Sequence, residues 1–323
     1  MDRTTELRRI AGGQDGLVTR VQALRIGFGR HEIDNLVTFG RWRRVARTVY
    51  LVGGGAGGES PDGRAAVVGP DVPAVRRRRI RAALLSLGPH AHAVLGTAAE
   101  LHGIAGLPPS DEIHVALPGA AARRERVRHP GLVLHQLEHP AASVVRVDGM
   151  AVTCPLRTVA EVIRRVGRYP AVSVLDSALC RRLITEDDLL SMPRLLRRRR
   201  GAVAARGYLA EADGRAQSPL ETRTRLRCVD GRVPPDVLQL PVRDDDGYLL
   251  GVGDLGWRGP RVIAEADGRG PHGSPEAIFA DRRRQNRLLN AGWTVLRFTW
   301  ADTLDPGYIP WTVRNAIAAS HRR

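Results

Sequence analysis

The segment that decides the fold lies in the last third of the chain, where residues 252–267 are VGDLGWRGPRVIAEAD. The pattern predicts two strands, 252–258 and 261–267, joined by a two-residue turn at Gly259 and Pro260. Glycine at the first central position is typical of a type II′ turn, which joins the strands of an antiparallel hairpin. The segment therefore predicts a hairpin with a defined register.

Acidic side chains face one another in this register. When Arg258 pairs with Arg261, Asp254 lies directly opposite Glu265, and Asp267 shares the face of Glu265 because side chains alternate along a strand. Facing carboxylates repel unless a cation bridges them, and oxygen ligands without thiol or imidazole favour Mg²⁺ or Mn²⁺. All three are candidate catalytic residues, and Asp254 and Glu265 are candidate metal ligands. The alternative is a solvated polar strand face, since Asp267 also begins an Asp-Gly turn pair.

A fourth carboxylate, Glu221, lies at the start of a helix that we expect to continue to about Val229. It is a candidate catalytic residue beside the three strand carboxylates. The alternative is an ordinary helix start, with Ser218 as N-cap, Pro219 at the first helical position and Glu221 completing a capping box. Further elements follow the hairpin: a helix over 274–290, a strand over 293–300 and a closing helix over 310–319.

The order of these motifs resembles the very-short-patch-repair-like endonuclease domain of the PD-(D/E)XK nuclease superfamily. The residues that carry the resemblance are Glu221, Asp254, Glu265, Asp267, Gly268, His272, Asp281, Arg284, Leu288, Gly292, Trp293 and the strand 295–298. The resemblance covers residues 215–323 and implies a restriction-endonuclease-like α/β domain with a mixed sheet. It also implies Mg²⁺-dependent hydrolysis of DNA, with Asp254 and Glu265 as metal ligands and Glu221 as a supporting acid.

The sequence departs from this family at one position. Asp267 stands where the superfamily usually has a lysine that orients the attacking water. Either His272 or Arg284 would take that role, or the domain is a weak or inactive nuclease.

The first 52 residues predict a winged helix-turn-helix. A helix near residues 5–11 comes first, and Thr19 with Gln22 forms a capping-box pattern that begins a second helix. A third helix over 30–39 is followed by two short strands around a turn at residues 46–47. This order of elements is typical of a DNA-binding module.

The third helix and the hairpin carry the candidate DNA contacts. We expect the polar helix face to enter the major groove and the hairpin arginines to contact phosphates. The helix residues are Arg30, His31, Asn35 and Thr38, and the hairpin residues are Arg41, Arg43, Arg44 and Arg47.

A Gly/Pro-rich stretch at 53–73 predicts a linker. The segment 74–200 mixes predicted strands, as at 113–117, with predicted helices, one of them capped by Thr97, and indicates an α+β domain. Its several histidines lack the ligand spacing of a zinc site.

Both N-terminal segments resemble the AbiEi-type antitoxin arrangement, a winged helix-turn-helix followed by an α+β domain. The residues that carry this resemblance are 16–19, 40–45, 49–50, 98–103 and 157–159. It implies binding to double-stranded DNA and a nucleotidyltransferase toxin as partner.

The composition is strongly basic, with 50 basic and 34 acidic residues, a formal net charge of +16 and no lysine. An all-arginine surface suits nucleic acid, although a GC-rich coding bias gives the same composition. The three cysteines, Cys154, Cys180 and Cys228, are too far apart and too few for a disulfide framework. No run of 18 apolar residues occurs, so we expect a cytoplasmic protein that does not enter a membrane.

The sequence thus predicts a multidomain α+β and α/β protein that binds DNA and carries a Mg²⁺-dependent (or Mn²⁺-dependent) endonuclease-like domain. The alternative is a non-enzymatic repressor or antitoxin of a type IV toxin–antitoxin system with a degenerate nuclease domain. RNA binding is a third class, although no RNP or KH motif accompanies the arginines.

Overall fold

The computed structural model describes residues 2–53, 73–118, 131–137, 139–268 and 275–322. The chain divides into two compact units: residues 1–104 with 109–162, and residues 105–108 with 163–323. Each unit combines helices with sheets, which confirms a multidomain α+β protein. The sequence predicted three blocks, at 1–52, 74–200 and 215–323. The two units differ from this division in one respect, because the helices after residue 163 belong to the same unit as the C-terminal residues. Most of the predicted linker, 54–72, lies outside the described residues.

The first part of unit 1 is a small helical block with a three-stranded antiparallel sheet of order β1-β3-β2. Its elements are α1 (Arg3–Gly12), β1 (Leu17–Thr19), α2 (Arg20–Arg25), α3 (Arg30–Thr38), β2 (Trp42–Ala46) and β3 (Val49–Val52). Buried Ile33, Trp42 and Tyr50 pack together between the helices and the sheet. The predicted helices and hairpin strands are confirmed, and β1 is an additional strand.

Local sequence explains the helix starts of this block. The Thr19 hydroxyl accepts from the backbone N–H of Gln22, whose side chain in turn accepts from the backbone N–H of Thr19, so the predicted capping box is present. The hairpin turn lies at Arg47 and Thr48 rather than at residues 46–47, with Thr48 in the left-handed region at φ 61°.

The rest of unit 1 is a five-stranded mixed sheet of order β6-β5-β4-β8-β7. Its elements are α4 (Ala74–Leu87), β4 (His92–Ala93), α5 (Leu95–Leu101), β5 (Ile113–Ala116), β6 (Leu132–His135), η1 (Ala141–Ser143), β7 (Val144–Val147), β8 (Met150–Thr153) and α7 (Pro155–Ile163). One core joins Ile80 and Leu84 of α4 to Val115 and Val152 of the sheet. The predicted Thr97 cap is wrong: α5 begins two residues earlier, and the Thr97 hydroxyl accepts from the backbone N–H of His114 instead.

An ion-pair cluster ties the first block to α4. Arg81 Nε lies 2.6 Å from Asp15 Oδ2, and Arg77 lies 2.9 Å from the other oxygen. Arg78 Nε also donates to the backbone carbonyl of Asp15 at 3.0 Å. Burial acts to raise the pKa of Asp15, but Arg81 and Arg77 outweigh it and lower the pKa. The arginine run of α4 is therefore partly a structural clamp.

Unit 2 begins with a helical part, α8 (Arg168–Cys180), α9 (Glu186–Leu196) and α10 (Ala202–Leu209). Its second part is a mixed four-stranded sheet of order β12-β11-β10-β9, in which only β11 and β12 are parallel. The elements are α11 (Pro219–Asp230), β9 (Val237–Arg243), β10 (Leu249–Trp257), β11 (Val262–Ala266), α12 (Pro275–Asn290), β12 (Thr294–Phe298), η2 (Ala301–Leu304) and α13 (Tyr308–Ser320).

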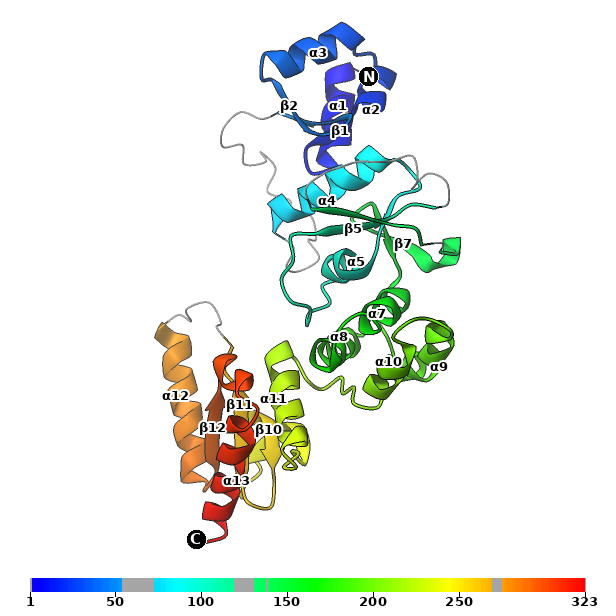
Figure 1. Ribbon diagram of the computed structural model, residues 1–323. Coiled ribbons are helices and arrows are strands. Elements are labelled where there is room, and N and C mark those ends of the chain that lie inside the picture. Colours follow the sequence, from blue (N-terminus) through cyan, green and yellow to red (C-terminus); the bar gives the residue numbers. More distant parts are fainter. Residues whose placement is uncertain (1, 54–72, 119–130, 138, 269–274, 323) are drawn as a thin grey trace. The chain divides into compact units, whose positions relative to one another are not determined.

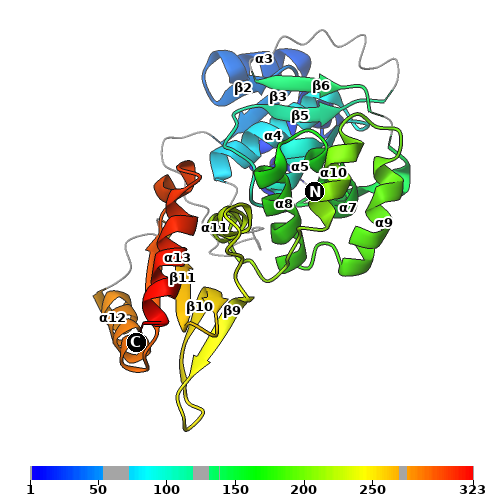
Figure 2. The ribbon, with the colours of Figure 1, turned by 60° about the horizontal axis from the view of Figure 1, so that its bottom comes forward.

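Helices cover both faces of this sheet, with α12 on one side and α11 and α13 on the other (Figure 1). Leu255, Phe298 and Val313 belong to the core under α13, whereas Ile263 and Leu288 belong to the core under α12. β9 and β10 form a long hairpin, yellow in Figure 2, and β9 was not predicted from the sequence. In the described part of the chain, no helix is both long and apolar enough to cross a bilayer.

Candidate functional site

The predicted β10–β11 register is confirmed. Leu255 pairs with Ala264 and Trp257 with Val262, which places Asp254 opposite Glu265. The predicted type II′ turn is wrong, because Gly259 does not adopt a positive φ.

Asp254 lies beside the buried Glu221 and Glu265, and a glutamine joins it to Glu221. Gln239 of β9 donates through Nε2 to Glu221 Oε2 at 2.9 Å and to Asp254 Oδ1 at 3.5 Å. Gln239 adopts φ 52°, which is unusual for a non-glycine residue in a strand. The strained backbone therefore accompanies the contact that joins the two carboxylates, and no sequence motif signalled this residue.

Glu221 lies at a capped helix start, but the predicted capping box is incomplete, because its carboxylate accepts from the backbone N–H of Gln217 rather than from that of the N-cap, Ser218. Ser218 caps α11 by accepting from the backbone N–H of Glu221 at 3.1 Å. The Glu221 carboxylate accepts from the backbone N–H of Gln217 at 2.9 Å while it also contacts Gln239. Burial raises the pKa of Glu221, and the nearby charge of Asp254 adds to the rise. Glu221 is thus both a residue of the helix start and a member of the acidic cluster.

Asp254 and Glu265 differ in how their charges are compensated. Burial raises the pKa of Asp254, and the charge of Glu265 acts in the same direction. Glu265 lies 2.7 Å from Arg284 NH1 and 3.3 Å from Arg297 Nε. Arg284 also pairs with Asp281 at 2.9 Å, and hydrogen bonds from Arg297 and Arg284 lower the pKa of Asp281. Two guanidinium groups therefore supply the positive charge at Glu265.

One further predicted site residue, Asp267, lies away from this cluster. The side chain of Asp267 is 55% exposed, and its ionic contact is with Arg297 NH1 at 3.8 Å, so it does not converge with Asp254. His272 lies outside the described residues.

The residues present do not fit the predicted Mg²⁺ as they are arranged. Both oxygens of Glu265 face guanidinium groups, and Asp254 Oδ2 accepts from the backbone N–H of Ala266 at 2.8 Å. Over the described ranges, no three histidine, cysteine or acidic side chains are grouped as a cation would need. As arranged, Glu265 has guanidinium groups as its nearest counter-charges.

The N-terminal block presents the predicted DNA contacts to solvent. Side chains of Arg30, His31, Asn35 and Thr38 are exposed on α3, while Ile33 of the same helix is buried. Arg41, Arg43, Arg44 and Arg47 are exposed at β2 and its turn. Asp34, an exposed acidic residue of α3, pairs with Arg20 at 2.7 Å. The block therefore combines a polar helix with a basic hairpin.

Arg43 and Arg44 lie on opposite faces of β2, because side chains alternate along a strand. The Arg44 guanidinium lies 5.9 Å from the centre of the Tyr50 ring. Arg43 lines a cavity against α4 instead. The two arginines predicted to contact the same DNA backbone therefore face different surroundings.

A buried histidine relay lies inside the α+β domain. His92 Nε2 is 2.8 Å from His139 Nδ1, and His139 Nε2 is 2.8 Å from Glu161 Oε1. Burial lowers the pKa of His92. These hydrogen bonds connect β4 to α7, so His92 and His139 act as internal hydrogen-bonding residues.

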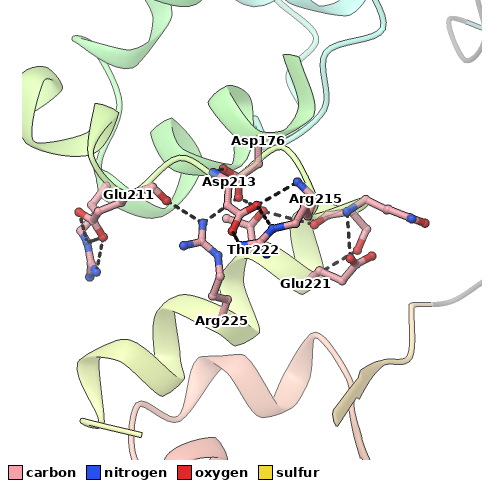
Figure 3. Close-up of polar contacts among 10 residues, drawn as sticks. Asp176, Glu211, Asp213, Arg215, Glu221, Thr222 and Arg225 are labelled. Carbon is pink, nitrogen blue, oxygen red and sulfur yellow. Dashed lines mark hydrogen bonds and ion pairs between the residues drawn. The ribbon is translucent and has the colours of Figure 1, made fainter. Parts of the chain in front are cut away.

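Unit 2 has a second buried polar network, between α8 and α11 (Figure 3). Asp176, only 1% exposed, accepts from the backbone N–H of Asp213 at 2.7 Å, from Thr222 Oγ1 at 2.8 Å and from Arg225 NH2 at 2.9 Å. Burial raises the pKa of Asp176, although Arg225 opposes the rise. The network fixes the start of α11, where Glu221 lies, to the helical part of unit 2.

Part of the chain matches a known protein family. Residues 91–211 match the family described as the AbiEi antitoxin C-terminal domain, which spans the five-stranded sheet and the helices that follow it. The predicted antitoxin resemblance is therefore confirmed for this part of the chain.

Two proteins of Mycobacterium tuberculosis, "Uncharacterized protein Rv2248" of strain H37Rv and "Uncharacterized protein MT2308" of strain CDC 1551, are each 35% identical to the chain over 218 residues. The alignment covers 68% of this chain and 78% of each relative, and the chain belongs to their family. The crystal structure of RV2827C protein from the same organism covers 73% of this chain and 84% of its own, at 16% identity and a TM-score of 0.39.

Proposed function

We propose that the protein is a DNA-binding repressor of the antitoxin type, with a winged helix-turn-helix at residues 1–52. One observation carries the proposal: an exposed polar helix and a basic hairpin lie N-terminal to a region, residues 91–211, that matches the AbiEi antitoxin C-terminal domain. Arg30, His31, Asn35 and Thr38 would read base edges from α3, and the hairpin arginines would contact phosphates. The net charge of +16 supports a polyanionic partner.

Selection of bound duplexes from a random pool tests sequence reading. The full-length wild type should enrich a defined site. Asn35→Ala should relax discrimination at about one base position, because an asparagine contact to adenine is worth about 1–3 kcal/mol. A pool that stays random with the wild type would contradict recognition by α3.

The proposed partner is a nucleotidyltransferase toxin encoded beside this gene. Coexpression of the full chain with such a reading frame should restore growth, and a variant with Arg41→Gln and Arg44→Gln should restore it equally if neutralisation does not need DNA. Growth arrest that the full chain never relieves would contradict the antitoxin role while leaving DNA binding intact.

Hydrolysis of DNA by a restriction-endonuclease-like domain is a second candidate function. It is favoured by the contact of Glu221 and Asp254 through Gln239, on a mixed sheet with helices on both faces. Plasmid incubated with Mg²⁺ or Mn²⁺ should be nicked by the wild type and not by Asp254→Ala if this function exists. Equal traces from both proteins would indicate a contaminant and remove the candidate.

A further inference from the structure

A cavity of about 380 Å³ lies in unit 1, between the hairpin strand β2, the helix α4 and the edge of the five-stranded sheet at β5 and β6. This volume is within the range of small-molecule sites, which is about 300–1,000 Å³. Arg43 is the one residue that this lining shares with the candidate DNA contacts. The cavity joins the N-terminal block to the AbiEi-family domain, because β2 comes from the first and β6 from the second.

The walls of the cavity are of two kinds. Apolar side chains line its interior, among them Val45, Ala83 and Leu132. Three arginines, Arg43, Arg78 and Arg79, and the hydroxyl-bearing Ser86 also line it, and no acidic side chain is among the described lining residues.

The three arginines are unequally engaged. Arg78 Nε donates to the backbone carbonyl of Asp15, and Arg79 NH1 lies 3.9 Å from Asp111, whose side chain is 98% exposed. The Arg43 guanidinium makes no hydrogen bond or ion pair with any residue that the structure describes. Guanidinium groups beside an apolar wall favour an anion with an apolar body, since carboxylate and sulfonate oxygens match their N–H donors and the body covers the wall.

From this lining we infer that the cavity is a binding site for an amphipathic small-molecule anion, such as an aromatic or medium-chain carboxylate. The anionic group lies toward Arg43 and Arg79, and the apolar body contacts Val45, Ala83 and Leu132. One chemical class of ligand satisfies both kinds of wall.

The site has a regulatory consequence that rests on the proposed DNA-binding function. If Arg43 contacts a phosphate in the DNA complex, a bound anion competes for the same guanidinium. By linkage, the anion and the DNA then weaken each other by the same factor.

Two fluorescent probes test the site in the full-length protein. Anilinonaphthalene sulfonate has an apolar body with an anionic group, and N-phenylnaphthylamine has a similar body without charge. Arg43→Gln and Arg79→Gln should each weaken binding of the sulfonate by about five-fold, the upper range for a partly exposed ion pair. The same variants should leave the affinity for the neutral probe unchanged.

Two further variants separate the cavity from the general basic surface. Ala83→Leu fills the apolar wall and should weaken both probes, with circular dichroism confirming that the fold is retained. Arg44→Gln removes the same charge from the opposite face of β2 and should change neither affinity. Equal sulfonate binding by all variants, or no binding by the wild type, would overturn the site.

The regulatory part has its own measurement. Titration of labelled duplex DNA at rising sulfonate concentration should weaken DNA binding by the wild type and not by Arg43→Gln. Sulfonate binding that is sensitive to Arg43 but insensitive to DNA would overturn the competition and leave the site. A wild type that binds no DNA in the absence of probe would instead contradict the proposed function.

Discussion

Replacement of Asp176 by alanine tests the most heavily connected buried charge of unit 2. The change removes an acceptor for three donors: the Asp213 backbone N–H, the Thr222 hydroxyl and the Arg225 guanidinium. The side chain of Arg225 is only 11% exposed, and the variant removes the carboxylate that balances its charge. Its remaining partner is the backbone carbonyl of Glu211, to which Arg225 NH2 donates at 2.8 Å. Removing one partner of a buried ion pair costs about 3–5 kcal/mol, and we expect a decrease of this size in the free energy of unfolding.

Urea unfolding followed by tryptophan fluorescence is the assay. Four of the five tryptophans, Trp257, Trp293, Trp300 and Trp311, belong to unit 2, so the signal reports that unit. Asp245→Ala, an exposed acidic residue in the turn between β9 and β10, is the control and should change stability by less than about 0.5 kcal/mol.

A double-mutant cycle identifies the physical cause. In an Arg225→Met background, Asp176→Ala should cost about 1–3 kcal/mol less than in the wild type, because no buried charge is stranded. Additive effects would refute the reasoning, since they would mean that the two side chains do not depend on each other.

Three further predictions concern other parts of the molecule. Burial raises the pKa values of Glu221 and Asp254 above those of the unfolded chain, so protonation of these carboxylates stabilises the fold as pH falls through the raised values. Glu221→Gln should therefore be more stable than the wild type near neutral pH and lose this advantage toward pH 4. Urea unfolding across pH measures the difference. The pKa of Asp15 is lowered in the folded chain, so its pairing with Arg77 and Arg81 stabilises the fold above the unfolded-state pKa, and this stabilisation is lost as pH falls through the folded-state pKa. Asp15→Asn should destabilise unit 1 by about 1–3 kcal/mol at neutral pH, measured by unfolding followed by circular dichroism. An unchanged stability would show that these ion pairs do not stabilise unit 1. Because Arg284 and Arg297 already neutralise Glu265, millimolar Mg²⁺ should leave the melting temperature of the wild type unchanged; a rise that Glu265→Gln abolishes would favour the nuclease candidate instead.

Local sequence signals predicted much of the fold. The register that places Asp254 opposite Glu265 follows from strand length and turn position alone, and the capping box at Thr19 defines the start of α2. Strands β1, β4, β7, β8 and β9 were not predicted. β4 has only two residues, and Pro241 interrupts the strand pattern of β9.

The charge state of the acidic cluster depends on contacts that the sequence does not specify. Glu265 meets Arg297 because β11 pairs with β12 in parallel, with these two residues as register partners. Arg284 reaches Glu265 from α12. The sequence contained both arginines, but neither local propensity nor spacing indicates which strand lies beside β11. The sequence therefore did not predict that guanidinium groups lie beside Glu265.

The central claim is that the N-terminal block binds DNA through its arginines. The salt dependence of duplex binding tests this claim most directly. Fluorescence anisotropy of a labelled duplex, repeated across salt concentrations, gives the slope of log K against log salt for the wild type and for the Arg41→Gln/Arg44→Gln variant. We predict a slope that is shallower by about 0.9 for each phosphate that the variant no longer neutralises. A charge-matched variant at exposed arginines of unit 2, Arg206→Gln/Arg282→Gln, should keep the wild-type slope. Identical slopes for the wild type and the hairpin variant would contradict the account.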